Sequence, residues 1–270
     1  MTLLRPTLQS TPSRSIRNTH FERNTIRFVP EEVPVAISYA GSSHAVLMAT
    51  PDDLVDFAIG FSLTEGIVQN ASQIRSLDVV EGELGIDVQV FLADDVSDRL
   101  RARKRSMAGP VGCGLCGIES IDQAMRTLPD LSAVELRMSH ASIVAATAEL
   151  ARAQDLHRQT RAVHAAGLYV EGSGLVGARE DVGRHNALDK LCGFVFRSSV
   201  AAEKGAVVVT SRISVEMVQK TAMLSCAMLI AVSAPTALAI RTAEAAGITL
   251  IALARGEDFE IFSNPHRVGP

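Results

Sequence analysis

The chain has 270 residues, of which 47% are hydrophobic and 4% aromatic, and it contains no tryptophan. Its formal net charge of -4 gives no overall reason to expect nucleic acid or an anionic membrane as a partner. The longest apolar run, residues 223–235, is too short to cross a bilayer, and residues 1–18 lack the apolar centre of a secretory signal. We therefore expect a cytoplasmic protein whose aliphatic core favours helices packed on parallel strands.

The first half of the chain predicts a tail followed by a small α+β domain. Residues 1–20 are rich in Ser, Thr and Arg, and we expect them to be disordered. Residues 21–130 are expected to form the N-terminal domain. A helix is predicted after Thr50, which can cap it, with Pro51 at its first position and Gly66 as its stop. Strands are expected at residues 25–28, 34–39, 45–48, 74–80 and 86–92.

Residues 131–270 predict a layered α/β domain. A helix is expected at residues 139–154, and two strands at 162–170 and 175–179. Helices and strands then alternate with short connections, which favours a sheet with largely parallel central strands. The predicted helices are residues 186–196, 215–226 and 236–246, and the predicted strands are residues 206–210, 228–232 and 249–253.

A glycine-rich loop carries the clearest chemical signal. It contains Cys113-Gly-Leu-Cys116, and residues 118–128 after it have helical periodicity. Thiols at a helix N-terminus are ionised more easily, and the basic residues within 99–105 add to the same potential. In a reducing compartment such a pair indicates redox, metal or catalytic chemistry rather than a structural disulfide. Cys192 and Cys226 lie in apolar, helix-like contexts and are expected to be buried.

Three chemistries are compatible with the cysteine pair: dithiol exchange, half of a zinc site, and persulfide transfer. Zinc is disfavoured because the sequence offers no second ligand pair at zinc spacing. Gly112-x-Gly114-x-x-Gly117 matches a dinucleotide fingerprint formally, but a basic segment precedes it instead of an apolar strand, so we reject it. Dithiol exchange stays open as a weaker alternative.

Polar residues recur at the connections that follow predicted strands. Residues 179–190, 210–220, 233–236 and 253–258 each lie between a strand and the next element. Arg212 beside a helix start is a candidate anion site, and His185 a candidate acid–base group, although a surface arginine and a helix-start histidine are common. Four such connections in one α/β region are expected to line one edge of the sheet.

Beyond these patterns, the chain resembles the FdhD formate dehydrogenase accessory sulfurtransferases. The resemblance is carried by Gly112-Cys-Gly-Leu-Cys-Gly117 and Arg179-Glu-Asp-Val-Gly-Arg-His-Asn186, and it extends from about Phe28 to the C-terminus. It implies a C-terminal domain with the cytidine-deaminase-like fold, without the zinc, and a homodimer. Further matching segments are residues 31–37, 48–54, 60–66, 187–190, 216–220 and 232–236.

The same resemblance implies a function. Cys113 would carry a persulfide received from a cysteine desulfurase, and Cys116 would assist its release to the molybdenum bis-guanine-dinucleotide cofactor that formate dehydrogenase needs. No resident metal is implied. The cofactor is expected to be held by Arg212, His185 and the stretch Ala252, Leu253, Ala254, Arg255, Gly256 and Glu257.

The chain also departs from the family pattern. Residues 160–164 read Thr-Arg-Ala-Val-His where a glycine-rich segment is expected, no glycine precedes Arg212, and the acids Glu257 and Asp258 follow the last predicted strand. These acids would repel phosphates. A rival interpretation is a non-catalytic chaperone that escorts the cofactor, with the thiols only stabilising their loop.

Overall fold

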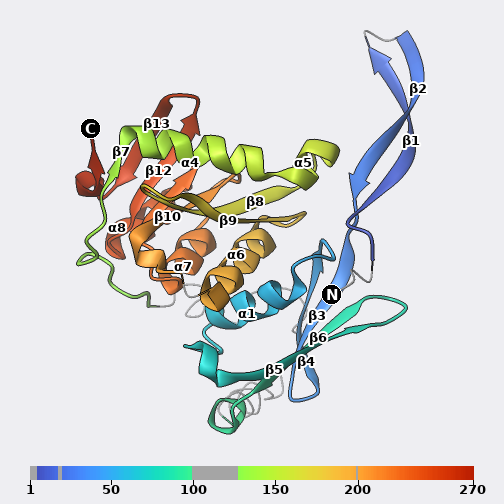
Figure 1. Ribbon diagram of the computed structural model, residues 1–270, viewed down its shortest axis with the longest axis horizontal. Helices are drawn as coiled ribbons and strands as arrows, with labels where there is room; N and C mark the ends of the chain where they lie inside the picture. Colours follow the sequence, from blue (N-terminus) through green and yellow to red (C-terminus); the bar gives the residue numbers. More distant parts are fainter. Residues whose placement is uncertain (1–4, 18–19, 99–126, 199) are drawn as a thin grey trace.

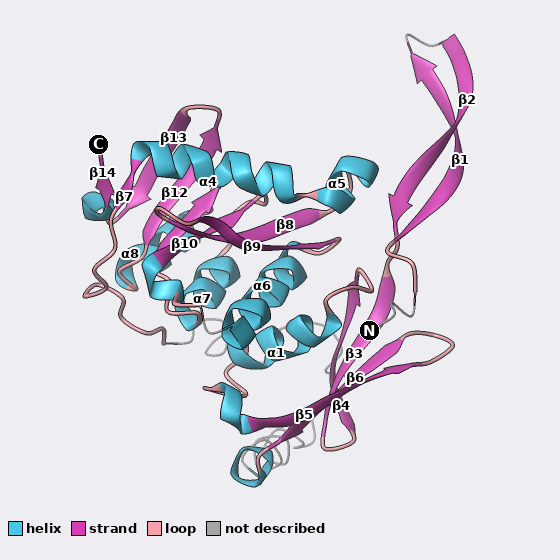
Figure 2. Ribbon diagram, in the orientation of Figure 1, coloured by secondary structure: helices cyan, strands magenta, loops and turns pink. Residues whose placement is uncertain are grey.

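The computed structural model describes residues 5–17, 20–98, 127–198 and 200–270. Figure 1 shows a layered body from which one long hairpin, hereafter the arm, projects. The arm consists of β1 (Leu8–Arg17) and β2 (His20–Pro30), which pair in antiparallel fashion. Figure 2 shows the same view coloured by secondary structure. The expectation of a disordered tail is wrong for residues 8–17, because their polar side chains hid a strand that pairs with the chain following it.

A four-stranded sheet follows the arm. Its strand order is β4-β3-β6-β5, with β3 (Val33–Tyr39), β4 (Ser42–Ala49), β5 (Ile74–Glu81) and β6 (Ile86–Leu92). Alternate side chains of β3 and β6 are buried, including Val35, Ile37, Val88 and Val90, as expected for a sheet with one packed face. That face packs in the same core as helix α1 (Leu54–Thr64).

The second half of the chain is built on a six-stranded mixed sheet. Its order is β13-β12-β11-β10-β8-β9, and only β10, β11 and β12 are parallel neighbours. The prediction of parallel central strands is confirmed for these three, whereas β8, β9 and β13 pair in antiparallel fashion. The strands are β8 (His164–Val170), β9 (Gly174–Asp181), β10 (Gly205–Val209), β11 (Met228–Ala231), β12 (Thr249–Arg255) and β13 (Asp258–Ser263).

Helices cover both faces of this sheet (Figure 1). Helix α4 (His140–Ala153) packs against the face that presents Ala206, Val208 and Ile230. The opposite face, with Val207, Val209 and Leu229, packs on α6 (Arg184–Ser198), α7 (Val215–Met223) and α8 (Ala237–Ala245). Further elements are α5 (Asp155–Thr160), the two-residue strands β7 (Met138–Ser139) and β14 (Val268–Gly269), and the 3-10 turns Ala71–Gln73, Ala202–Lys204 and Pro265–Arg267.

Helix α1 joins the two halves of the molecule by packing closely on α6. A Cβ added at Gly60 would lie 1.7 Å from the backbone oxygen of Asp189, and one added at Gly193 would lie 1.9 Å from that of Asp56. Only glycine permits such an approach of two helix backbones. One apolar cluster therefore runs from the four-stranded sheet through α1 and α6 to the six-stranded sheet.

The α/β class is confirmed, and the likeness to cytidine deaminases and the domain limits 21–130 and 131–270 stay predictions. Two local expectations were wrong. Thr50 does not cap α1, which begins at Leu54 after Asp53, a residue with φ of 50°. The strand expected to end at residue 253 continues to Arg255 and turns back into β13, which the acidic composition of residues 257–260 concealed.

Candidate functional site

Four strands end at one edge of the six-stranded sheet, as the sequence predicted. β9 is antiparallel to β8, and β8 to β10, so β9 runs in the same direction as β10, β11 and β12. The connections after the strands also contact one another. Ile213 donates its N–H to the Ala234 carbonyl at 3.2 Å, and Leu253 donates to that of Ser233 at 3.3 Å. We call this region the carboxyl edge.

Arg212 lies exposed in the connection from β10 to α7. Ser214, the residue before α7, has extended backbone angles but makes no side-chain cap, and its buried Oγ has no partner among the described residues. The buried Nε of Arg184, at the start of α6, likewise has none there. Unpartnered buried polar atoms are costly, so this edge has hydrogen-bonding capacity to offer a ligand near two helix N-termini.

The stretch from Ala252 to Glu257 begins with buried residues of β12 and ends with exposed residues of a turn. Ala252 and Ala254 are buried strand residues, whereas Arg255, Gly256 and Glu257 are exposed at the turn into β13. Leu253 between the alanines has a φ of 54° at an irregularity of the β12–β13 pairing. A left-handed leucine inside a strand is strained, and such strain is often found at ligand sites.

Arg255 is aimed at the neighbouring connection. Its Nε donates to the Val232 carbonyl at 3.0 Å while the residue stays exposed. The carboxylates of Glu257 and Asp258 are exposed directly after it. The turn therefore offers one guanidinium group to an anion, and the two neighbouring carboxylates reduce the positive potential around that group.

His185 belongs to the same edge. Its Nε2 lies 3.1 Å from an Oε of Glu216 at the first turn of α7. Burial lowers the pKa of His185, and the carboxylate of Glu216 opposes that shift. His164 begins β8, where burial and then the charge of Arg184 lower its pKa. Two histidines with a lowered pKa therefore lie at the carboxyl edge, and sequence reasoning singled out only His185.

Most of the charged string from Arg179 to Lys190 has a structural role instead of facing a ligand. Asp181 and Lys190 form an ion pair of 2.7 Å with both side chains fully buried. The Asp181 carboxylate also accepts from the Thr50 N–H at 3.0 Å, and Lys190 donates to the Thr50 carbonyl at 3.0 Å. The interpretation of this string as one ligand-binding cluster is therefore wrong for its buried members.

A second set of polar contacts ties α1 to the same string. Arg179 donates to an Oδ of Asp56 at 2.7 Å, and Arg197 donates to the other at 2.6 Å. Thr64 donates to Asp189, which also pairs with Lys220. The sequence pointed to these residues only through their unusual density of charge; their partners in α1 could not be found without the fold.

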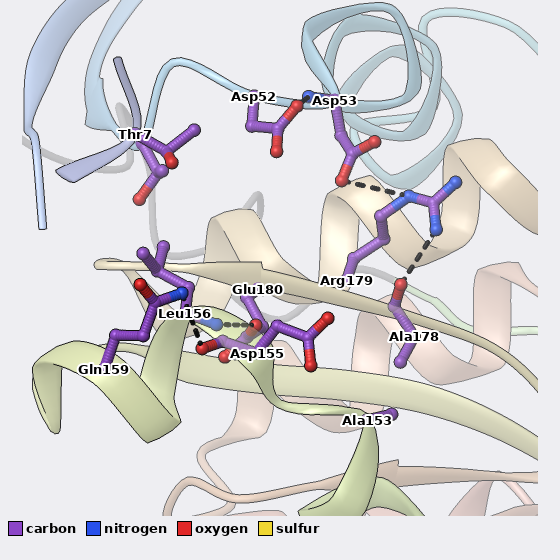
Figure 3. Close-up of a pocket in the computed structure, with 11 residues that line it drawn as sticks. Thr7, Asp52, Asp53, Ala153, Asp155, Leu156, Gln159, Ala178, Arg179 and Glu180 are labelled. Atoms are coloured by element: carbon purple, nitrogen blue, oxygen red, sulfur yellow. Dashed lines mark hydrogen bonds and ion pairs between the residues drawn. The ribbon is translucent and has the colours of Figure 1, made fainter.

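A cavity of about 270 Å³ opens at the base of the arm (Figure 3). Four carboxylates contribute to its lining, with Arg179 as the single charged counterpart among the lining residues. Desolvation raises the pKa of Asp53 and of Glu180. This acidic pocket is unsuited to a phosphate. It is lined by Thr7, Thr50, Asp52, Asp53, Ala153, Asp155, Leu156, Gln159, Ala178, Arg179 and Glu180.

The predicted sulfur-carrying pair, Cys113 and Cys116, lies outside the described residues, as does the basic segment 99–105. Cys192 and Cys226 are buried, as predicted. Burial raises the pKa of the Cys192 thiol and raises that of Cys226 to about 11. Both are therefore poor nucleophiles.

Within the described ranges, no group of three or more His, Cys, Asp or Glu side chains could hold a metal ion. No helix there combines the length and apolarity needed to cross a membrane.

The fold and the carboxyl edge define an α/β protein with a candidate anion-binding edge. Its N-terminal layer packs on the α/β half through the contact of α1 with α6. The chain belongs to the FdhD/NarQ family, which it matches over residues 30–269. It is 63% identical over 242 residues to the sulfur carrier protein FdhD of Agrobacterium fabrum, with 90% of this chain and 89% of that protein covered.

Other relatives agree with this membership. The sulfur carrier protein FdhD of Brucella abortus is 57% identical over 242 residues, covering 90% of each chain. The crystal structure of a putative formate dehydrogenase accessory protein from Desulfotalea psychrophila aligns with a TM-score of 0.77 at 25% identity, covering 98% of this chain and 100% of that one.

Proposed function

We propose that this chain is a cytoplasmic sulfurtransferase for formate dehydrogenase. It accepts sulfur from a cysteine desulfurase on Cys113 and passes it to the molybdenum bis-guanine-dinucleotide cofactor, which is its substrate. We also propose that it acts as a homodimer and needs neither nucleic acid nor a membrane. The observation that carries the proposal is the Cys113-Gly-Leu-Cys116 pair inside a family match to sulfur carrier proteins.

The cysteines of the described core support this assignment by elimination. A sulfur carrier needs a thiol that forms a thiolate and reaches its donor. Cys192 and Cys226 are 0% exposed and their thiols are hard to ionise. Of the four cysteines in the sequence, this leaves Cys113 and Cys116 for the chemistry.

The transfer can be written with balanced bonds. The Cys113 thiolate attacks the outer sulfur of the desulfurase persulfide, whose S–S bond breaks and releases the desulfurase thiolate. The Cys116 thiolate then attacks the inner sulfur of the Cys113 persulfide. This forms a Cys113–Cys116 disulfide and releases hydrosulfide to the molybdenum. The sulfane sulfur is thereby reduced at the expense of the two thiols, and an external dithiol reductant restores them.

The carboxyl edge is the proposed holder of the guanine-dinucleotide part. Arg212 and Arg255 are exposed there, and the same edge carries the buried Arg184 Nε and Ser214 Oγ, which have no partner among the described residues. Guanidinium groups and helix N-termini are suited to pyrophosphate. His185 lies at the same edge with its Nε2 directed at the Glu216 carboxylate, so the Nδ1 of the neutral ring can accept a hydrogen bond from a ligand N–H or O–H.

Sulfur loading tests the proposal. The chain is incubated with a cysteine desulfurase and 35S-cysteine, separated, and counted for bound label. We expect labelling of the wild type and of Cys192→Ala, and loss of label in a Cys113→Ala, Cys116→Ala double variant. Equal labelling of the double variant contradicts the assignment. Formate dehydrogenase activity in cells carrying that variant separates a sulfurtransferase, which loses activity, from an escort, which retains it.

A further inference from the structure

The four-stranded sheet packs on α1 with one face only, and its other face is exposed (Figure 1). Val35 and Val88 are buried on the packed face. Of the nine exposed large apolar side chains in the described part of the chain, five belong to this sheet and its β5–β6 turn. They are Val46, Met48, Val80, Leu84 and Phe91. Exposed apolar side chains that gather on one surface mark an interaction site.

The strand register places these side chains on the same side of the sheet. Met48 lies opposite Pro34 and Val46 opposite Ala36, at positions that alternate with the buried ones. Val80 of β5 belongs to the same set, because successive side chains of a strand point to opposite faces. We call this side the outer face. At the usual spacings it measures about 19 Å across four strands and about 23 Å along β3, a size suited to the centre of a protein interface.

The outer face is acidic as well as apolar. Asp87 lies on it, and its two carboxylate oxygens accept hydrogen bonds from Ser38 at 2.6 Å and from Gln89 at 2.9 Å. Asp78 lies on the same side, opposite Gln89, and Glu83 is exposed in the adjoining turn. A carboxylate offers about four acceptor sites. Asp87 can therefore still accept a hydrogen bond from a cationic group of a partner.

The N-terminal layer has a charge far from that of the whole chain. Residues 31–98 contain 13 Asp and Glu, one arginine and no lysine, a formal net charge of -12, whereas the whole chain carries -4. The single arginine, Arg75, pairs with Asp94. Such an asymmetry indicates a charged partner and steers its approach. The layer disfavours a phosphate-bearing ligand, and it suits a protein surface with Lys and Arg around an apolar patch.

We infer that the outer face docks the cysteine desulfurase, through a desulfurase surface with an apolar centre and a basic rim. This assignment rests on the proposed function, which requires a protein sulfur donor and an anionic sulfur acceptor. The acceptor is assigned to the carboxyl edge, where Arg212 and Arg255 are exposed, so the acidic layer is left for the donor. The chain path agrees, because residues 99–126, which include Cys113, follow shortly after β6 of this sheet.

Charge reversal tests the docking surface. Binding of the full chain to a purified cysteine desulfurase is measured by biolayer interferometry. An Asp78→Lys, Glu83→Lys double variant should raise the dissociation constant about tenfold or more, and the wild-type affinity should fall as salt rises. Glu244→Lys, Glu260→Lys is the matched control, because it makes the same charge change at two exposed acids of the other half. It should bind like the wild type.

The apolar part of the surface is tested without a change of charge. Val46→Ser, Met48→Ser should likewise raise the dissociation constant about tenfold. Ile261→Ser replaces an exposed apolar side chain of β13 and should leave the affinity unchanged. Thermal melting followed by circular dichroism checks that each variant keeps its fold. Unchanged affinity in both outer-face variants, or an equal loss in the controls, would overturn the inference.

Sulfur loading separates this inference from the function on which it rests. The outer-face variants should need about tenfold more desulfurase for half-maximal 35S labelling, yet reach the wild-type level of label. The final level is kept because Cys113 and Cys116 are unchanged. A wild type that takes no label overturns the sulfurtransferase assignment itself. A labelled wild type whose outer-face variants load at the same desulfurase concentration overturns the docking surface alone.

A photo-cross-link identifies the occupant of the outer face. With Val46→p-benzoylphenylalanine, irradiation in the presence of the desulfurase should join the two proteins. The same group at Ile261, on β13, should not. A cross-link from position 46 within the chain, or to a second copy of it, would show that another segment covers this surface, and would overturn the inference.

Discussion

Lys220 donates from Nζ to both carboxylate oxygens of Asp189, at 2.7 and 2.9 Å, inside the core. Burial alone lowers the pKa of a lysine, but the carboxylates of Asp189 and Glu65 outweigh it and raise that of Lys220. Thr64 of α1 donates to the same aspartate at 2.6 Å. The buried ammonium group of Lys220 on α7 is thus paired with Asp189 of α6 and contacts Thr64 of α1. These contacts hold the N-terminal layer against the C-terminal half.

Lys220→Met is predicted to destabilise the chain by about 3–5 kcal/mol, because it leaves the Asp189 carboxylate buried without a counterion. Urea unfolding, followed by circular dichroism, measures this. The double variant Lys220→Met, Asp189→Leu removes both charges and should recover most of the loss. A single variant as stable as the wild type would show that the pair contributes nothing to holding the layers together.

The close contact of α1 and α6 predicts a large effect from one methyl group. In Gly193→Ala the new Cβ would lie 1.9 Å from the Asp56 carbonyl oxygen, so the helices must separate. Overpacking of this kind costs about 1–3 kcal/mol or more. The melting temperature should fall by several degrees. Gly82→Ala is the matched control, since its added Cβ meets no atom closer than 3.5 Å, and it should melt like the wild type.

His164 predicts a pH dependence of stability. Burial, with Arg184 and then His157 nearby, lowers its pKa below the unfolded value, against the opposing charge of Asp181. Below about pH 6.5 the unfolded chain therefore binds the proton first, and stability falls as the pH decreases. The slope from this residue cannot exceed about 1.4 kcal/mol per pH unit.

The measurement compares the unfolding free energies of the wild type and His164→Gln between pH 5 and 7.5. As the pH falls toward 5, the free energy of unfolding of the wild type should decrease more than that of the variant, because the variant lacks the titrating group. Parallel curves would assign the pH dependence of the wild type to other groups. Glu180 is one such group, since its raised pKa acts with the opposite sign.

The sequence predicted the helices and strands of the second half because their apolar periods are regular and their connections short. It also predicted that strand ends such as those before Arg212 and Arg184 share an edge, since parallel strands impose this. It could not reveal the arm, because residues 8–17 alternate no apolar side chains and form a strand only through pairing with β2. The sequence also could not identify Thr50 and Thr64 as partners of Asp181 and Asp189, since each pair is separated by more than 120 residues.

The cofactor site proposed at the carboxyl edge leads to a prediction for guanine-nucleotide binding. If Arg212 and Arg255 contact its phosphates, Arg212→Ala or Arg255→Ala should each weaken GDP binding about tenfold, the loss expected for one charge-assisted contact. Isothermal titration calorimetry at low salt measures this, and the affinity should fall as salt rises. Arg241→Ala removes an exposed arginine of α8 and serves as the control. Glu257→Gln should tighten binding, because it removes a carboxylate two residues from Arg255. Unchanged affinity in Arg212→Ala, Arg255→Ala and Glu257→Gln would place the nucleotide elsewhere.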